Sequence, residues 1–289
     1  MSKKGLCFLL ACSLCIGGST TVEAKKPENA VKVTSRQSLV RAVYEMMAER
    51  EETGRFYYKG DCAKIFDEDV KGLLVDVCAI DDKSTTDDAD YLSNCIYTMT
   101  VHSSKNVRRS KAIESVLEVT VQYYEDAYQL EKVNQRVEEL LPKLELEGKS
   151  KYKKIKKIHD YVVKYLSYSH GGAFPYSAYG ALTEKSAVCQ GYAQLMYKLL
   201  MAAGIPCRTV TGKSYSNGNV EDHVWNVVKL KGKWYYLDAT WDDPIGNGDM
   251  LIYDYFLKGS DTFSRDHQVS KRYEKVARKV AKSDYKRMG

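Results

Sequence analysis

One stretch constrains the fold more than any other: "KSAVCQGYAQLMYKLLMAAGIPCRTVTG", Lys185 to Gly212. Its apolar residues recur at the spacing of an α-helix, and they are Tyr192, Leu195, Met196, Leu199 and Leu200. Gly204 can end such a helix, and the β-branched residues that follow favour a strand. The pattern therefore predicts a buried helix that leads directly into a strand.

A cysteine stands at the start of this predicted helix. If Ser186 caps the helix, Cys189 lies in the first turn. Backbone N–H groups without helical partners and the helix macrodipole favour an anion there, and a thiolate is such an anion. A cysteine is also a residue type that is often simply buried, so a structural role stays open at this point.

The next two segments, "DHVWNVVKL" and "KWYYLDATW", are typical of strands, and Lys231-Gly232 between them suits a two-residue hairpin turn. If Leu230 pairs with Lys233, His223 and Asp238 point to the same face as diagonal neighbours, about 7–8 Å apart at the backbone. A shift of one residue would place them on opposite faces. The turn therefore predicts that an imidazole and a carboxylate can meet.

A cysteine at a helix N-terminus, together with a histidine and an aspartate on one sheet face, is what nucleophilic acyl transfer requires. Cys189 would be the nucleophile, His223 its base and later proton donor, and Asp238 the group that orients the imidazole. The thiolate would attack an amide carbonyl and form a thioester that water or an amine resolves. The backbone N–H of Cys189 is the expected oxyanion donor, with Tyr179 or Trp241 as candidates for a second one.

These motifs resemble those of the transglutaminase-like superfamily, in its secreted bacterial type. The resemblance covers roughly Tyr152 to His267 and is carried by "AVCQGYA", "GIPCRTVTG", "DHVWNVV" and "WYYLDATWDDP". It implies a papain-like core whose Cys-His-Asp triad falls at Cys189, His223 and Asp238. "YFLKGSDTFSRDH", Tyr255 to His267, resembles a trailing segment of secreted members and receives no role. Members include cross-linking enzymes, peptidases, deglycosylating enzymes and inactive proteins, so the resemblance implies a reaction class and no substrate.

The first residues have the pattern of a secretory signal peptide. Lys3 and Lys4 precede an apolar run, and Val22-Glu23-Ala24 is a small-residue cleavage site, so cleavage after Ala24 is expected. A lipoprotein anchored through Cys12 is the less favoured alternative. The apolar run is shorter than the ~20 residues that a membrane-spanning helix needs. We expect a secreted or cell-surface protein that does not span a membrane.

Beyond residues 1–24, the pattern predicts an α+β chain with two domains. Residues 25–149 form a small α+β domain with a helical linker, and residues 150–289 form the transglutaminase-like catalytic domain with a basic tail. In the first domain, helices are expected in "SRQSLVRAVYEMMAERE", with Ser38 as N-cap, and in "AKIFDEDVKGLLVDVCAI". Strands are expected in "GRFYYKG", "YLSNCIYTMTV" and "SVLEVTVQYY", and a surface loop in "DDKSTTDDAD". An amphipathic helix with His159 as a packing residue opens the second domain.

Cysteine spacing and charge limit the other ligands. Removal of residues 1–24 leaves five cysteines, an odd number: Cys62, Cys78, Cys95, Cys189 and Cys207. Cys189, Cys207 and His223 lack the spacing of a zinc site, and no other metal or cofactor motif is present, so neither a metal nor a cofactor is expected. The last twenty residues hold eight Lys or Arg and two acidic residues. This basic tail is either a solvated helix or a contact for an anionic surface, and export argues against nucleic acid.

Two functions follow from the sequence. The first is an exported thiol enzyme acting on amide bonds of peptides or proteins, either as a cysteine peptidase or amidase or as a protein-glutamine acyl transferase. The second is a non-catalytic surface or cell-wall binding module that keeps the fold. The first requires a reactive thiolate at Cys189 and the second does not.

Overall fold

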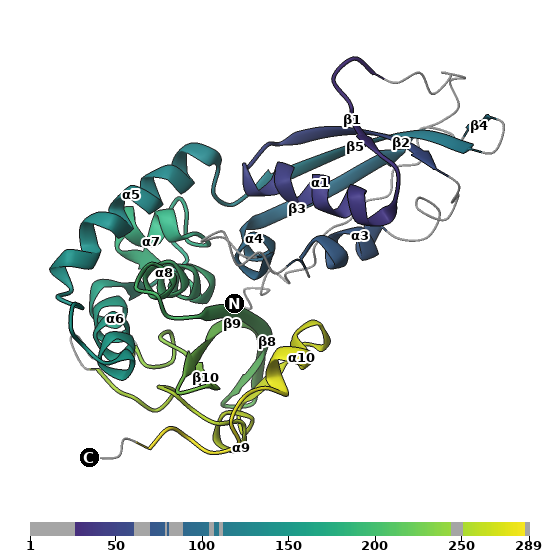
Figure 1. Ribbon diagram of the computed structural model, residues 1–289. Coiled ribbons are helices and arrows are strands. Elements are labelled where there is room, and N and C mark those ends of the chain that lie inside the picture. The colour runs from purple at the N-terminus through teal and green to yellow at the C-terminus, as the bar shows by residue number, and fades with distance from the viewer. Residues whose placement is uncertain are drawn as a thin grey trace. The chain divides into compact units, whose positions relative to one another are not determined.

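A computed structural model describes residues 27–60, 70–78, 80, 89–103, 107–109, 112–243 and 251–286. Contacts divide the chain into two compact units, one ending at Ala127 and the other beginning at Tyr128, and each is described by itself (Figure 1). The helical segment expected as a linker is therefore grouped with the second unit. The mixture of helices and strands is the predicted α+β class. None of the helices among the described residues is both long and apolar enough to cross a bilayer.

The N-terminal unit is a sheet with helices packed on it. Its strands are β1 (Val31–Val33), β2 (Thr53–Gly60), β3 (Ile96–Ser103), β4 (Val107–Arg109) and β5 (Ala112–Tyr123), and its helices are α1 (Arg36–Ala48), α3 (Val70–Val77) and α4 (Ala89–Cys95). The sheet order is β1-β2-β5-β3, with β4 also on β5, and only the β1–β2 pair is parallel.

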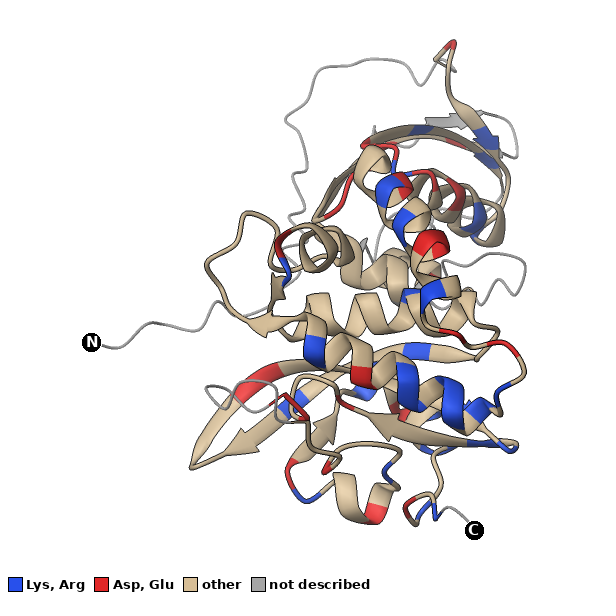
Figure 2. Ribbon diagram, turned by 90° about the vertical axis from the view of Figure 1, so that its left-hand side faces the viewer, with Lys and Arg blue, Asp and Glu red and all other residues tan. Residues whose placement is uncertain are grey.

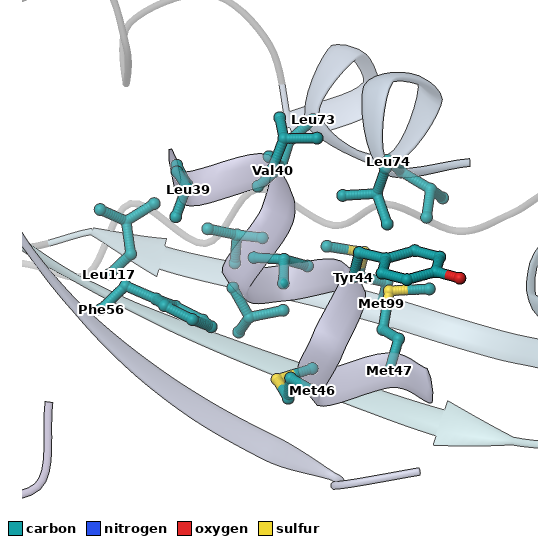
Figure 3. Close-up of a cluster of buried hydrophobic side chains, with 14 of the residues drawn as sticks. Leu39, Val40, Tyr44, Met46, Met47, Phe56, Leu73, Leu74, Met99 and Leu117 are labelled. Atoms are coloured by element: carbon teal, nitrogen blue, oxygen red, sulfur yellow. The ribbon is translucent and has the colours of Figure 1, made fainter. Parts of the chain in front are cut away.

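The core of this unit lies between the helices and one sheet face (Figure 3). From the helices come Leu39, Val40, Tyr44, Met46, Met47, Leu73 and Leu74, and from the strands come Phe56, Met99 and Leu117. Burying about a dozen large apolar side chains gives this unit a core of its own. No group with the geometry of a metal site occurs among its described residues.

Two local predictions in this unit are wrong. Helix α1 is capped by Ser35, and Ser38 is the N3 residue of a reciprocal capping box, because the helix begins earlier than its apolar pattern. The segment predicted as one strand from Tyr91 starts with helix α4, and β3 begins only at Ile96. All residues from Tyr91 to Ile96 are buried, and a short run of this kind does not distinguish a helix from a strand. Most of the predicted acidic loop and Cys62 lie outside the described residues.

The C-terminal unit combines a helical layer with a second sheet. The helices are α5 (Ala127–Lys143), α6 (Lys151–Tyr165), α7 (Ala178–Glu184), α8 (Cys189–Ala202), α9 (Ser260–Phe263) and α10 (Glu274–Ala277), with a 3-10 helix at Lys271–Tyr273. The strands are β6 (Ser167–Tyr168), β7 (Ser186–Ala187), β8 (Cys207–Ser216), β9 (Asn219–Leu230), β10 (Lys233–Leu237) and β11 (His267–Val269).

Helix α8 is the central element of this unit, as its apolar sequence predicted. Every residue from Cys189 to Leu200 is buried, because α6 and α7 cover one side of the helix and β9 the other (Figure 1). The Asn226 side chain on β9 donates a hydrogen bond to the carbonyl of Ala193 in α8 (3.0 Å). The second turn of the helix is thereby fixed against the sheet.

The sheet beside α8 has the order β10-β9-β8-β11 and is antiparallel throughout. Leu230 pairs with Lys233, and both turn residues have positive φ, +49° at Lys231 and +82° at Gly232. Positive φ at both positions defines a type I′ turn, whose twist matches that of the strands. The hairpin register predicted from the sequence is confirmed.

The basic tail is attached to this sheet. Tyr273 and Val280 are buried in the same cluster as Trp225 and Tyr236, and the N–H of Ala281 donates to the carbonyl of Trp234 (2.9 Å). The only α-helix in residues 271–286 is α10, so the tail is an anchored, largely irregular segment instead of the solvated helix that was expected.

Gly212 allows β11 to pack on β8. A Cβ atom there would lie 2.1 Å from the backbone oxygen of Gln268 and 2.6 Å from a ring carbon of Trp225. We expect Gly212→Ala to lower the free energy of unfolding by roughly 1–3 kcal/mol, because both neighbours must move. Urea denaturation checks this, with Gly171→Ala in an exposed loop as the matched control. Equal stability of the two variants would contradict this reading of the β8–β11 contact.

Candidate active site

Cys189 is the first residue of α8, with Val188 as N-cap. The predicted cap by Ser186 is wrong: Ser186 lies in β7, where its backbone pairs with Ser167 of β6. No side chain caps the helix. The N–H groups of the first turn are therefore not used by a side-chain cap. Together with the positive end of the helix dipole, they are available to stabilise an anion at Cys189.

The Cys189 thiol is free and 6% exposed. It packs with Ala193 of its own helix, with Val224 of β9 and with the ring of Tyr168. The side chain of His223 also contacts it through a hydrogen bond. The cysteine is therefore a buried group whose hydrogen-bonding partner is an imidazole.

His223 on β9 and Asp238, directly after β10, meet as the hairpin register predicts. The distance from His223 Nε2 to Asp238 Oδ2 is 2.7 Å. Because Nε2 is occupied by Asp238, Nδ1 is the ring nitrogen left for Cys189. The other carboxylate oxygen, Oδ1, accepts the backbone N–H groups of Thr240 (3.0 Å) and Trp241 (3.2 Å).

This arrangement favours a charged histidine. Burial alone would lower the pKa of His223, but the charge and hydrogen bond of Asp238, followed by the contact with Cys189, raise that pKa to about 10. For Asp238, burial opposes ionisation, yet His223 and then His267 hold its pKa well below the ordinary range. At neutral pH the pair is therefore an imidazolium and a carboxylate.

A cavity of about 340 Å³ opens beside His223. Its lining consists of Tyr168, Ser214, Ser216, Asn217, Asn219, Glu221, His223, Thr240, Trp241 and Asp243. Tyr168 connects the cavity with the cysteine, because it lines the cavity and also packs against the cluster that contains Cys189. Of the two aromatic residues suggested as oxyanion donors, Trp241 lines the cavity, whereas Tyr179 packs edge-on against Phe174 (ring centroids 5.4 Å apart).

Two residues at the site were missed by the sequence analysis as participants. Tyr168 has no motif around it, and its position depends on the short β6–β7 pairing. His267 belongs to the trailing segment that received no role. Its Nε2 lies 3.2 Å from Oδ2 of Asp238, and this contact joins positions 29 residues apart. The signals in the sequence were the acidic-histidine pair Asp266-His267 and the resemblance of Tyr255 to His267 to a trailing segment of secreted members.

A second buried histidine–aspartate pair lies away from the cysteine. His159 of α6 is fully buried, and its Nε2 is 3.0 Å from Oδ2 of Asp242. Burial would lower the pKa of His159, but hydrogen bonds to Asp160 and Asp242 raise it. His159 has the packing environment that its place on the amphipathic helix predicted.

Within the described residues, three metal-ligating side chains converge at one place: His223, Asp238 and His267. Their ligand atoms already hydrogen-bond to one another, at 2.7 Å and 3.2 Å through the shared oxygen Oδ2. A hydrogen-bonded network accounts for this geometry. The expectation of no metal and no cofactor stays a prediction.

A cysteine at the start of a buried helix, with a hydrogen-bonded histidine–aspartate pair on the adjoining antiparallel sheet, is the arrangement that the chemistry of thiol enzymes requires. Residues 138–239 match the family model described as the transglutaminase-like superfamily. The domain formed by these residues belongs to that superfamily, as the sequence motifs predicted.

Similar proteins have been described in animals and bacteria. Kyphoscoliosis peptidase from Homo sapiens is 37% identical over 93 residues, and the match covers 27% of this chain and 14% of that protein. The Mus musculus protein of the same name is 36% identical over 93 residues, with the same shares. This chain therefore spans only about one seventh of the length of these relatives.

Among solved structures, a TGase has a TM-score of 0.34 at 13% identity, covering 74% of this chain and 59% of that one. The periplasmic domain of TgpA from Pseudomonas aeruginosa has a TM-score of 0.30 at 18% identity, covering 49% and 65%. Similarity of this extent carries no information about substrates.

Proposed function

We propose that this protein is an exported thiol enzyme that acts on amide bonds of peptides or proteins through a thioester at Cys189. The observation that carries the proposal is the contact series from Cys189 through His223 to Asp238. Membership in the transglutaminase-like superfamily supports the reaction class. Export is supported by the signal-like pattern of residues 1–24 and places the substrate outside the cytoplasm.

The proposed reaction starts from a thiolate at Cys189 and an imidazolium at His223. The sulfur attacks the amide carbonyl carbon, a C–S bond forms, and the carbonyl oxygen becomes an oxyanion that the N–H of Cys189 and a donor from the cavity wall can stabilise. His223 gives its Nδ1 proton to the departing amine as the C–N bond breaks. Water or an amine then attacks the thioester, His223 takes its proton, and the thiolate is regenerated.

Trapping the thioester tests this proposal. The full chain is incubated with dimethylcasein and with a mixture of short peptide amides, with and without biotinylated cadaverine, and quenched in acid for mass spectrometry. An acyl adduct on Cys189, with release of ammonia or of a peptide amine, is the expected result. Biotin incorporation would identify acyl transfer, and free acid products alone would identify hydrolysis.

The matched control for this assay is a second buried cysteine of the same unit. Cys207, at the start of β8, is 2% exposed and has no place in the proposed reaction. Cys207→Ala is expected to form the adduct, whereas Cys189→Ala is not. Turnover that persists in Cys189→Ala would contradict the proposal.

A different cavity favours the second function, a surface or wall-binding module. It measures about 630 Å³ and is lined by Ser150, Lys151, Tyr152, Lys153, Pro206, Lys229, Leu230, Lys231, Gly232 and Tyr285. Its four lysines form no salt bridge with a described residue, and no carboxylate lines it. Figure 2 shows basic residues gathered along α6, which contributes part of this wall.

An anionic polymer would suit this lysine-lined cavity. Binding of an anionic polymer at this cavity is measured with polyphosphate-coated beads. The Cys189→Ala variant is compared with a variant that carries both Lys229→Glu and Lys231→Glu. If the polymer binds while Cys189 forms no adduct with any amide, the binding function replaces the enzymatic one. If the adduct forms, any binding here serves the enzyme.

A further inference from the structure

Asp238 is buried, with 1% exposure, and all of its acceptor capacity is used. Oδ1 accepts two backbone N–H groups, and Oδ2 faces the Nε2 atoms of both His223 (2.7 Å) and His267 (3.2 Å). A carboxylate offers about four lone-pair sites, so this one is saturated. Two of its four partners are imidazoles, and the proposed reaction uses only one of them.

His267 is held from its other side by a second carboxylate. Its Nδ1 is 2.6 Å from Oδ1 of Asp266, and Oδ2 of Asp266 accepts the hydroxyl of Tyr255 (2.6 Å). The backbone N–H of Tyr255 in turn donates to the buried Asp242 (2.8 Å). Hydrogen bonds therefore run without a gap from Tyr255 through Asp266 and His267 to Asp238.

The ring of His267 has little freedom to turn. The side chain is fully buried, and it stacks on Phe263 with ring centroids 4.1 Å apart and an interplanar angle of 30°. The ring of Trp241 packs edge-to-face with the His267 ring, with ring centroids 4.5 Å apart. Strand β11 fixes its backbone, because His267 pairs with Ser214 of β8. A donor held this firmly can orient its acceptor.

We propose that His267 is a positioning residue: its Nε2–H fixes Asp238 Oδ2, and through it the ring of His223 that faces Cys189. This role rests on the proposed function, since it places the histidine that would serve the thiol. His267 is not among the residues that line the cavity beside His223. Without it, Oδ2 is held by His223 alone, and the carboxylate is restrained otherwise only by the two backbone N–H groups at Oδ1.

The charge of the arrangement is consistent with this role. Both nitrogens of His267 face carboxylate oxygens, so a proton on either ring nitrogen has an acceptor. The groups around the ring are Asp266, Asp238, His223 and the phenol of Tyr255, so two carboxylates surround one additional imidazole. The second imidazole then also limits how strongly Asp238 attracts the proton of His223.

The test distinguishes two contributions of the His267 side chain, its N–H donor and the packing of its ring. His267→Phe keeps a planar ring on Phe263 and removes the donor, whereas His267→Gln keeps an N–H that can reach Asp238. The rate of iodoacetamide labelling at Cys189 in the full chain is measured from pH 5 to 9. We expect His267→Phe to slow labelling at pH 7 by roughly 10- to 100-fold, and His267→Gln to recover most of it.

The control is Tyr215→Phe. The hydroxyl of Tyr215 donates to Gln268 (2.7 Å), so this variant also removes a side-chain hydrogen bond to β11 without touching Asp238. It is expected to keep the wild-type labelling profile. Labelling by His267→Phe at the wild-type rate, or His267→Gln no faster than His267→Phe, would show that His267 only fills space.

A second readout is independent of the thiol. In Cys189→Ala, the proton between His223 and Asp238 should give a low-field proton resonance, and His267→Phe should shift or broaden it while Tyr215→Phe leaves it in place. If that resonance responds but wild-type Cys189 labels like a free thiol, the positioning role stands and the proposed function fails. If Cys189 is reactive and neither readout responds to His267→Phe, the positioning role fails alone.

Discussion

Replacing His223 with alanine is expected to slow iodoacetamide labelling of Cys189 at pH 7 by roughly 10- to 100-fold, because a thiol without a cationic partner is only a few per cent thiolate at that pH. In the wild-type protein, the positive charge of His223 beside the sulfur favours the thiolate. Despite burial, Asp238 and then Cys189 raise the pKa of His223 to about 10, so the imidazole stays protonated beside the sulfur.

The pH profile distinguishes this effect from a change in access. Wild-type labelling should depend less on pH between pH 6 and pH 8 than labelling of the variant, since His223 keeps its proton over that range. Labelling of His223→Ala should rise steadily with pH up to about pH 9, as for an ordinary thiol near pKa ~8.5. If the variant is instead slower by the same factor at every pH, the histidine acts on access and not on ionisation.

Cys189 is only 6% exposed, so the size of the reagent also matters. Tyr168 lines the cavity and packs against the cluster that contains Cys189, whereas Cys189 itself does not line the cavity. A bulky maleimide serves as the comparison. Equal ratios of wild-type to His223→Ala rates for both reagents would confirm that the histidine sets reactivity, because access is then divided out.

The local part of the site was predictable from the sequence. A two-residue turn fixes the register of the strands it joins, and strand alternation then decides which side chains share a face, so the meeting of His223 and Asp238 followed from Lys231-Gly232. The buried helix α8 was predictable from local sequence too, since its large apolar residues recur at helical spacing.

The remainder depended on contacts between distant segments. Ser186 has the chemistry of a helix cap, but pairing of β7 with β6 uses it in a strand, and this pairing leaves no local mark. His267 reaches Asp238 only because β11 adds to the sheet next to β8, at the opposite edge from β10. Neither the sheet order nor the pairing of a three-residue strand can be obtained from alternation in one segment.

The loss of Asp238 should have the largest effect on stability, because four groups would lose their acceptor in a buried site. We expect Asp238→Ala to lower the free energy of unfolding by about 3–5 kcal/mol, seen as a fall in Tm.

The effect of Asp238 on stability should depend on pH. With its pKa held below the ordinary range, Asp238 stabilises the fold above pH ~4, and this contribution is lost as the carboxylate is protonated at lower pH. The contribution of His223, whose pKa is raised to about 10, is complete below pH ~6.5 and fades as pH rises toward 10.

Asp242 provides the matched comparison, because it too is a buried carboxylate that binds a buried histidine and a backbone N–H. It accepts from His159 (3.0 Å) and from Tyr255 (2.8 Å), and burial raises its pKa despite those bonds. Asp242→Ala should also lower Tm, since His159 and the Tyr255 N–H lose their acceptor, yet change the labelling profile of Cys189 much less than Asp238→Ala does, because the Asp242 side chain bonds to His159 and Tyr255 and not to His223. Asp238→Ala should change both strongly. If the two variants affect Tm and labelling alike, the Asp238 contacts stabilise the domain without setting the chemistry of the thiol. If only the Asp238 variant alters the profile, reactivity at Cys189 depends on one specific pair and not on stability alone.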